Sequence, residues 1–377
     1  MLSHCMRMFS MLGFCLLSAI PCFAQSPALS PAKYTQASLA EMRQAVAQAS
    51  AHGLPWSGPV SGPAGRSGAT IAIVCEDLRN GGILGVANGI NEASKVIGWK
   101  IAVYDAGGTP DGRSKALAAA RALKPDGVII IGADAGEIRA QLEPFSVRGI
   151  PIVGWHVGPF AGPIPDGPVA MNVSTNPLDV ARITAMAAVI ASGGHAGVVI
   201  FTDGNFAIAK AKSNAMADVI RACKGCTLLE VRDVAISESG ERMPAVTRDL
   251  LARYGARWTY ALAINDIYFD YAVPELTKAG LPSDRISMLS AGDGSSAAFL
   301  RIQAGAFQTG TVAEPLNLQG WQLVDELNRL LAHQSVTGYV APVHLITAKN
   351  VAFDGGPQMR YDPDNGYRDI YRRIWKR

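Results

Sequence analysis

The sequence has few charged residues and gathers none of them into a run. Charged side chains make up 17% of the 377 residues, the formal net charge is +3, and no Lys/Arg cluster or basic stripe is present. Nucleic-acid-binding proteins carry such a stripe to neutralise phosphates, so we expect no nucleic-acid partner. The hydrophobic share of 49% is that of an ordinary globular chain.

Long apolar runs are also missing, with one exception at the N-terminus. Arg7 precedes an apolar run over residues 8–20, and Cys22 and Ala24 are small residues at the two positions that a signal peptidase reads. This layout predicts a cleaved secretory signal over residues 1–24 and a periplasmic protein. A membrane anchor is the alternative, but about a dozen apolar residues are too few to span about 30 Å of hydrocarbon.

Cysteines are few, and three of the six lie within residues 1–24. Cys75 sits in an apolar run, so we expect a buried core residue. Cys223 and Cys226 can close a small disulfide in an oxidising compartment, with a redox pair or half of a zinc site as alternatives. Zinc usually takes four ligands, and the sequence offers no second cysteine pair or histidine cluster, so we expect no metal.

Signatures of catalysis are absent as well. The sequence contains no Gly-x-Ser-x-Gly elbow and no Walker A loop, and the glycine-rich residues 81–85 lack the spacing of a dinucleotide fingerprint. His156 and Asp293 suit a general base and its orienting acid, so an exported enzyme with a cleft active site stays open as an alternative. We expect no enzyme activity and no cofactor.

Residues 25–68 are predicted to form an N-terminal segment outside the main body. Ser38 and Glu41 make a capping box that begins a helix running to about Ala51. The Gly/Pro/Ser-rich residues 53–68 that follow predict a linker. The sequence leaves open whether the helix packs on the body, with Trp56 as an anchor, or extends away from it.

From Ala69 onward, short apolar runs alternate with segments of helical periodicity, and the pattern restarts after residue 173. Such alternation predicts an α/β fold of two doubly wound parallel-sheet lobes joined by a multi-strand hinge. We assign residues 69–172 plus 316–342 to lobe 1 and residues 173–315 plus 343–377 to lobe 2. The C-terminal tail from Asp354 is therefore expected on lobe 2.

Polar and aromatic side chains follow several predicted strands at the point where each strand ends. Ligands of open α/β sheets bind outside these carboxyl ends, so loops of two facing lobes should line one cleft. For each residue, turn formation or helix capping is the alternative role. The loops concerned follow Cys75, Val153, Phe201, Ile264 and Ser290.

Four blocks, at residues 80–99, 124–153, 263–295 and 302–315, resemble a known family in their order and spacing. The family is that of the type I periplasmic binding proteins of sugar-type ABC transporters, which includes ribose- and galactose-binding proteins. The resemblance covers roughly residues 69–350. It implies two lobes that close over one small ligand about a hinge.

The resemblance also implies which residues contact the ligand. It matches Asn80, Lys212, Asn265, Asp293 and Glu314 to family positions, and it places His156 and Val157 where an Asp-Arg pair is usual. Gly82 and Ile83 replace the aromatic rings that stack on sugars, and Trp155 and Phe206 are candidate substitute walls. The predicted ligand-binding residues are Arg79, Asn80, Trp155, His156, Phe206, Lys212, Asn265, Asp293 and Glu314.

These observations predict a periplasmic solute-binding protein that captures a sugar-like or polyol-like molecule. The expected partners are that small-molecule ligand and the membrane permease of an ABC transporter, and we expect a monomer. A ligand-sensing partner of a chemoreceptor or sensor kinase is the alternative, because it shares the fold and the cleft. Repressors that share this fold need an N-terminal DNA-binding headpiece, and here a signal peptide and a linker stand in its place.

Overall fold

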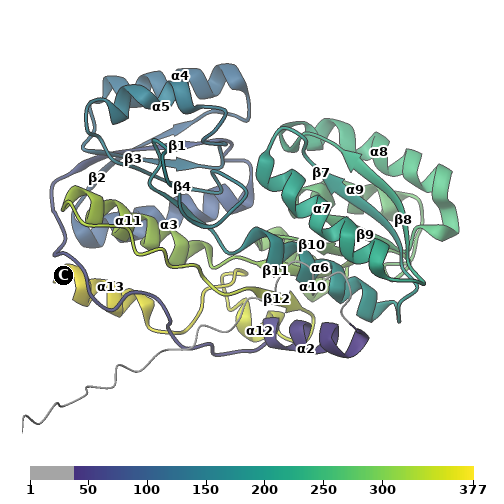
Figure 1. The fold of residues 1–377 in the computed structure, drawn as a ribbon. Helices are drawn as coiled ribbons and strands as arrows, with labels where there is room; N and C mark the ends of the chain where they lie inside the picture. Colours follow the sequence, from purple (N-terminus) through teal and green to yellow (C-terminus); the bar gives the residue numbers. More distant parts are fainter. Residues whose placement is uncertain (1–37) are drawn as a thin grey trace, which may run out of the picture.

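Two lobes, each built on a six-stranded sheet, make up the protein (Figure 1). The computed structural model describes residues 38–377; the predicted signal peptide and the leader that follows it lie outside the described residues. The strands are β1 (Thr70–Cys75), β2 (Lys100–Asp105), β3 (Gly127–Ile131), β4 (Ile152–Trp155), β5 (Gly162–Pro163), β6 (Met171–Val173), β7 (Gly197–Thr202), β8 (Thr227–Asp233), β9 (Tyr260–Ala263), β10 (Ser287–Ser290), β11 (Gln308–Ala313) and β12 (His344–Thr347).

Helices cover the sheets and connect their strands. They are α2 (Leu39–Ala49), α3 (Gly81–Ile97), α4 (Pro110–Ala122), α5 (Arg139–Ser146), α6 (Pro177–Ala191), α7 (Ala207–Ala222), α8 (Ser239–Tyr254), α9 (Ile267–Lys278), α10 (Ser296–Ala304), α11 (Leu316–Leu331), α12 (Val351–Asp354) and α13 (Tyr367–Trp375), with short 3-10 turns at Ile236–Glu238 and Gly255–Arg257. Within residues 38–377, no helix is both long and apolar enough to cross a membrane.

The strand order confirms the predicted α/β fold. Lobe 1 has the order β2-β1-β3-β4-β6-β5 and lobe 2 the order β12-β11-β10-β9-β7-β8. All neighbouring strands are parallel except the edge pairs β5–β6 and β11–β12, which are antiparallel. The central strands β1 and β3 read as continuous apolar runs because helices cover both faces of the sheet there.

Strand β1 shows how the alternation of side chains divides the core of lobe 1. Ile71 and Ile73 point into a cluster formed with α3 and α11, whereas Ala72 and Val74 point into a second cluster formed with α4 and α5. Successive residues of a strand face opposite sides of the sheet, so one short run contributes to both layers. The carboxyl end of the strand is thereby fixed at the edge where the site lies.

The N-terminal segment packs on the body rather than extending away from it. Helix α2 begins with the predicted capping box, in which Ser38 Oγ accepts from the Glu41 backbone N–H and the Ser38 N–H donates to Glu41 Oε2. Met42 and Ala49 are buried in the core cluster of lobe 2. Residues 53–68 contain no helix or strand, as predicted, and lead from lobe 2 to the start of β1 in lobe 1.

The prediction that the C-terminal tail lies on lobe 2 is wrong for its last part. Helix α12 packs on lobe 2, but α13 packs against α11 and α3 of lobe 1. The indole of Trp375 stacks on Trp321 with ring centroids 5.4 Å apart, and its Nε1 donates to Asp325. The tail crosses back because α11 presents an aromatic side chain and a buried carboxylate that α13 covers.

The three cysteines of the main body fall into two kinds. Cys223 and Cys226 form a disulfide that closes the turn between α7 and β8. Cys75 is a free, fully buried thiol, and burial together with the nearby charge of Asp105 raises its pKa to about 12. Its thiol is therefore a packing group of the core.

Candidate ligand-binding site

A cavity of about 370 Å³ lies between the two lobes, at the carboxyl ends of the strands. Both lobes contribute polar and apolar side chains to its wall, which is the arrangement of a small-molecule site. The lining from lobe 1 includes Glu76, Asp77, Asn80, Ile83, Thr109, Arg113, Trp155 and His156, and that from lobe 2 includes Asp203, Asn205, Phe206, Lys212, Ile236, Asn265 and Asp293.

Most of the predicted ligand-binding residues line this cavity. They are Asn80, Trp155, His156, Phe206, Lys212, Asn265 and Asp293. Glu314 lies behind them, where its carboxylate accepts from the Thr175 backbone N–H and from Gln319 Nε2. Arg79 does not line the cavity.

Arg79 is turned away because a carboxylate two residues earlier captures its guanidinium. Its Nε and Nη2 donate to the two oxygens of Asp77 at 2.9 and 2.7 Å, and Nη2 also donates to the Gly107 carbonyl. The Arg79 side chain is 64% exposed, whereas the Asp77 side chain is 7% exposed and lines the cavity. Asp77, rather than Arg79, is therefore the charged group of this turn that faces the cavity.

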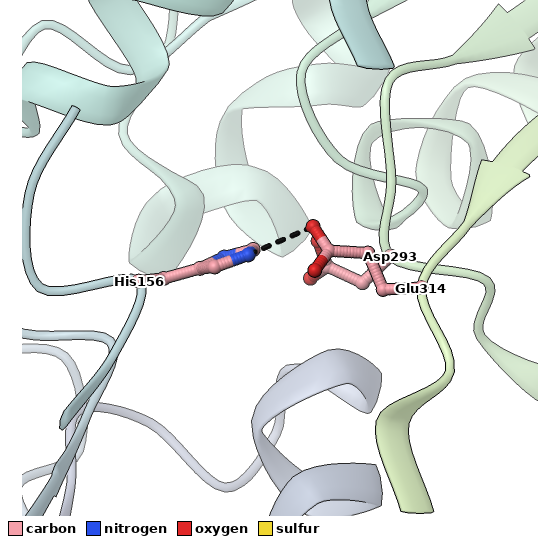
Figure 2. Close-up of side chains that lie close together, drawn as sticks. All are labelled: His156, Asp293 and Glu314. Atoms are coloured by element: carbon pink, nitrogen blue, oxygen red, sulfur yellow. Dashed lines mark hydrogen bonds and ion pairs between the residues drawn. The ribbon is translucent and has the colours of Figure 1, made fainter. Parts of the chain in front are cut away.

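Four charged or ionisable side chains meet at the floor of the cavity, three of them shown in Figure 2. His156 Nε2 lies 2.8 Å from Glu314 Oε1. Lys212 Nζ lies 4.0 Å from an oxygen of Asp293 and from Glu314 Oε1, and donates to the Ala291 carbonyl at 2.8 Å. All four side chains are at least nine-tenths buried.

The two carboxylates of this cluster are tuned in opposite directions. Burial raises the pKa of Asp293 to about 6, although the charges of Lys212 and His156 oppose the shift. Burial acts on Glu314 in the same sense, but His156, Lys212 and the hydrogen bond from Gln319 outweigh it and lower its pKa to about 2. Glu314 is therefore a fixed negative charge, and Asp293 is the group that can exchange a proton near pH 6.

The geometry of the cluster also resembles a metal site. One ligand atom each from His156, Asp293 and Glu314 lie within 4.8 Å of one another. The ammonium of Lys212 lies beside both carboxylates and supplies the positive charge that they require. The arrangement is that of a buried ion-pair cluster, and the absence of a metal requirement stays a prediction.

The imidazole of His156 is held by its neighbours on both sides. The residue has a left-handed backbone with φ of 52°, and its ring stacks on Trp155 with centroids 3.6 Å apart. Trp155 is held in turn because its Nε1 donates to Gln319 Oε1 at 2.8 Å. Trp155 therefore packs against the ring of His156, and the two residues together form part of the cavity wall.

Two asparagines combine a capping role with a place in the cavity wall. Asn80 Oδ1 accepts from the Gly82 N–H at the start of α3, and Asn265 Oδ1 accepts from the Ile267 N–H at the start of α9. Asn265 Nδ2 also donates to Asp293 at 2.8 Å. Both asparagines therefore cap a helix, which was the alternative role considered for them, and both also line the cavity.

The space beside the start of α3 is filled by a protein side chain. A Cβ atom built on Gly82 would lie 2.6 Å from both Cβ and Cγ of Asp293. Lobe 1 and lobe 2 are thus in direct contact here, and no room remains for an aromatic ring at position 82. Sugar binders usually carry an aromatic ring at this position, and here Asp293 occupies the space that such a ring would need.

The lobes also meet at a helix end. Helix α7 begins after Phe206, which has no side-chain oxygen to cap it, and the Ala207 N–H donates instead to Asp134 Oδ2 of lobe 1 at 3.4 Å. An acidic side chain at a helix N-terminus is stabilised by the unpaired N–H groups and the helix dipole. This contact across the cleft indicates a closed arrangement of the lobes.

Some parts of the cavity wall were not predicted. Arg113, in the first turn of α4, forms a two-point ion pair with Glu76 through Nε and Nη2, at 2.7 and 2.6 Å. Residues 235–238 are also unpredicted, as are Gly132 and Glu137, which follow β3. The sequence could have predicted Arg113, because α4 starts at the same carboxyl edge of the sheet as the predicted loops.

Comparison with known proteins agrees with this geometry. A family model described as a periplasmic binding protein domain matches residues 71–335. The fold therefore defines a two-lobed binding protein, and the chain belongs to the periplasmic binding protein domain family. No curated protein sequence matches the chain.

Solved structures of the same fold include three ABC transporter solute-binding proteins. One from Agrobacterium vitis with bound allitol is 19% identical, with a TM-score of 0.65, and the match covers 76% of this chain and 97% of that one. A second from Agrobacterium vitis, bound with α-D-tagatopyranose, is 17% identical, with a TM-score of 0.68 and coverage of 78% and 99%. One from Mycobacterium smegmatis with bound glycerol is 16% identical, with a TM-score of 0.68 and coverage of 78% and 99%.

Proposed function

We propose that this chain is the periplasmic solute-binding protein of an ABC transporter and that it captures a small polyhydroxylated solute in the cleft between its lobes. The observation that carries the proposal is the cavity of about 370 Å³ at the carboxyl ends of the strands, with buried hydrogen-bonding groups from both lobes. A solute that bridges the two lobes stabilises the closed arrangement by its differential affinity.

The chemistry of the cavity floor favours hydroxyl groups. Asp293 is an acceptor when ionised, Lys212 is a donor with one of its three N–H bonds used by Ala291, and Asn265 and Asn80 present amide groups. A hydroxyl both donates and accepts, so it suits a site that mixes the two kinds of group. The allitol, tagatopyranose and glycerol in structures of the same fold support this choice.

The predicted residues divide into two roles under this proposal. Asn80, His156, Lys212, Asn265 and Asp293 contact the solute, and Phe206 supplies an apolar wall. Trp155 and Glu314 hold the imidazole of His156, and Arg79 holds the carboxylate of Asp77.

The cellular role rests on the family and on the N-terminal sequence. Residues 1–24 would direct export, and the mature chain would act as a monomer in the periplasm. It would deliver its solute to a membrane permease, with no reaction of its own. The closed arrangement of the lobes is the form that a permease would receive.

A thermal-shift screen of the mature chain, from Gln25 onward, tests the proposal. The panel contains polyols, sugars, nucleosides, amino acids and small amides. A solute at 100 times its dissociation constant stabilises the folded chain by about 2.7 kcal/mol, which raises the melting temperature by several degrees. We expect a shift with a polyhydroxylated compound, and a shift confined to compounds without hydroxyl groups would contradict the proposed solute class.

A further inference from the structure

The segment that joins α2 to β1 is fixed to both lobes. We call residues 50–68 the belt. Figure 1 shows α2 and α13 along the lower edge of the molecule, and the belt passes between them on its way to β1. The cavity-lining residues all fall between Glu76 and Asp293, so the belt holds the lobes from outside the cavity.

On lobe 2, α2 and the start of the belt are firmly anchored. Met42 and Ala49 are buried in the core cluster of this lobe, where α2 packs against α6. His52 Nδ1 lies 2.5 Å from Asp354 Oδ1, and the other oxygen of Asp354 lies 2.8 Å from His344 Nε2. Because Asp354 is buried, this pairing fixes the belt to the interior of the lobe.

On lobe 1, the belt supplies partners to polar groups of the buried helix α11. Arg329 Nη2 donates to the Ser61 carbonyl at 2.7 Å, and the Arg66 N–H donates to Asn328 Oδ1 at 3.0 Å. The Gly65 N–H donates to the Trp375 carbonyl of α13 at 2.9 Å. Buried polar groups are costly to leave unpaired, so these contacts hold the belt in place.

The middle of the belt contacts a hinge connection directly. The ring of Trp56 lies 5.1 Å from that of Tyr339 and 5.5 Å from that of Tyr371. Tyr339 belongs to residues 332–343, which connect α11 of lobe 1 to β12 of lobe 2. Two aromatic contacts of this kind together can change the ratio of open to closed molecules by about tenfold.

A second extra crossing runs alongside the belt. Tyr361 stacks on His344 of lobe 2 with ring centroids 4.1 Å apart, and Asp362 accepts from the Tyr367 hydroxyl of lobe 1 at 2.9 Å. Residues 355–366 thus form a short connection from lobe 2 to lobe 1. Within residues 38–377, the belt and this crossing add two connections to those at 174–176, 314–315 and 332–343.

We propose that the belt holds the two lobes near the closed arrangement and so limits how readily the cleft opens. Its ends are fixed on different lobes, so rotating one lobe against the other must break an anchor or bend the belt. A larger closed population in the free protein raises the apparent affinity for the solute, because less binding energy is used to close the lobes.

Interlobe distances in the ligand-free protein test this proposal. Spin labels are attached at Lys115→Cys on α4 and Glu241→Cys on α8, which are exposed positions on lobe 1 and lobe 2. The protein used is the mature chain, from Gln25 onward. Its native cysteines do not interfere, because Cys75 is buried and Cys223 and Cys226 form the disulfide. No solute is present, so the result does not depend on the proposed function.

Three variants are compared in this background. Trp56→Ala removes the aromatic anchor, and an insertion of a few Gly/Ser residues after Gly53 keeps every anchoring side chain but uncouples the two ends. Val60→Ala is the matched control, since Val60 lies in the belt and is 77% exposed. Circular dichroism confirms that each variant is folded, and the insertion serves as the test where Trp56→Ala does not fold.

We expect the insertion and Trp56→Ala to move the distance distribution to longer values. For Trp56→Ala, the ratio of open to closed molecules should rise about tenfold, in line with the two lost ring contacts. Val60→Ala should match the unaltered protein. A distribution for the insertion variant that superimposes on that of the unaltered protein would overturn the proposal.

Discussion

Replacing Gly82 with alanine should weaken solute binding while leaving the ligand-free fold intact. The added Cβ would lie 2.6 Å from Cβ and Cγ of Asp293, closer than side-chain carbons pack. Gly82 begins α3 of lobe 1 and Asp293 follows β10 of lobe 2, so the clash exists only when the lobes are closed. Relieving it requires a separation on the order of 1 Å, which an open cleft supplies without strain.

The size of the effect follows from the cost of overpacking. Extra methyl groups in a packed contact cost about 1–3 kcal/mol, which corresponds to a rise of about 5- to 150-fold in the dissociation constant. Calorimetric titration with the solute found in the screen measures the affinity, and thermal unfolding without solute measures the fold.

Gly158→Ala is the matched control for this experiment, because a Cβ at that glycine meets no atom within 4 Å. It should bind as the unaltered protein does. Unchanged affinity in Gly82→Ala, or an equal loss in both variants, would refute the reasoning that the lobes close through this contact.

Three further outcomes follow from the charges around the cleft. Because burial raises the pKa of Asp293 to about 6, affinity for a hydroxyl donor should fall about tenfold between pH 7 and pH 5, and Asp293→Asn should remove this dependence in titrations. Asp134→Ala removes the oxygen that accepts from the Ala207 N–H, so the dissociation constant should rise about three- to tenfold while ligand-free stability hardly changes. The pKa of Glu314 is lowered to about 2, so its ionised form stabilises the fold above about pH 4.5, and this stabilisation is lost as the pH falls toward 2. Urea unfolding measures the loss: between these pH values, the free energy of unfolding should fall by about 3 kcal/mol less in Glu314→Gln than in the unaltered protein.

The sequence predicts the fold well where local pattern decides it. The run Thr70–Cys75 is apolar on both faces because α3 and α11 cover one side and α4 and α5 the other, and such runs identify central parallel strands. The strand-end rule then places Asn80, His156, Asn265 and Asp293 at one edge. The structure brings these four side chains to one cavity.

The sequence predicts less where a long-range partner decides the outcome. Arg79 sits in a cleft loop, but Asp77 two residues earlier takes its guanidinium out of the cavity. Arg113 reaches the cavity through Glu76, which lies 37 residues away along the chain. Helix α13 has an apolar face that fits many surfaces, and it packs on lobe 1 because α11 offers it the buried Trp321 and Asp325.

The most direct test of the central claim is a calorimetric titration of the mature chain, from Gln25 onward, with the strongest polyhydroxylated compound from the screen. The account predicts one bound solute per chain and a loss of measurable binding in Asp293→Ala, whose carboxylate pairs with Asn265 at the cavity floor. Binding of unaltered affinity in Asp293→Ala would contradict the placement of the solute in this cleft.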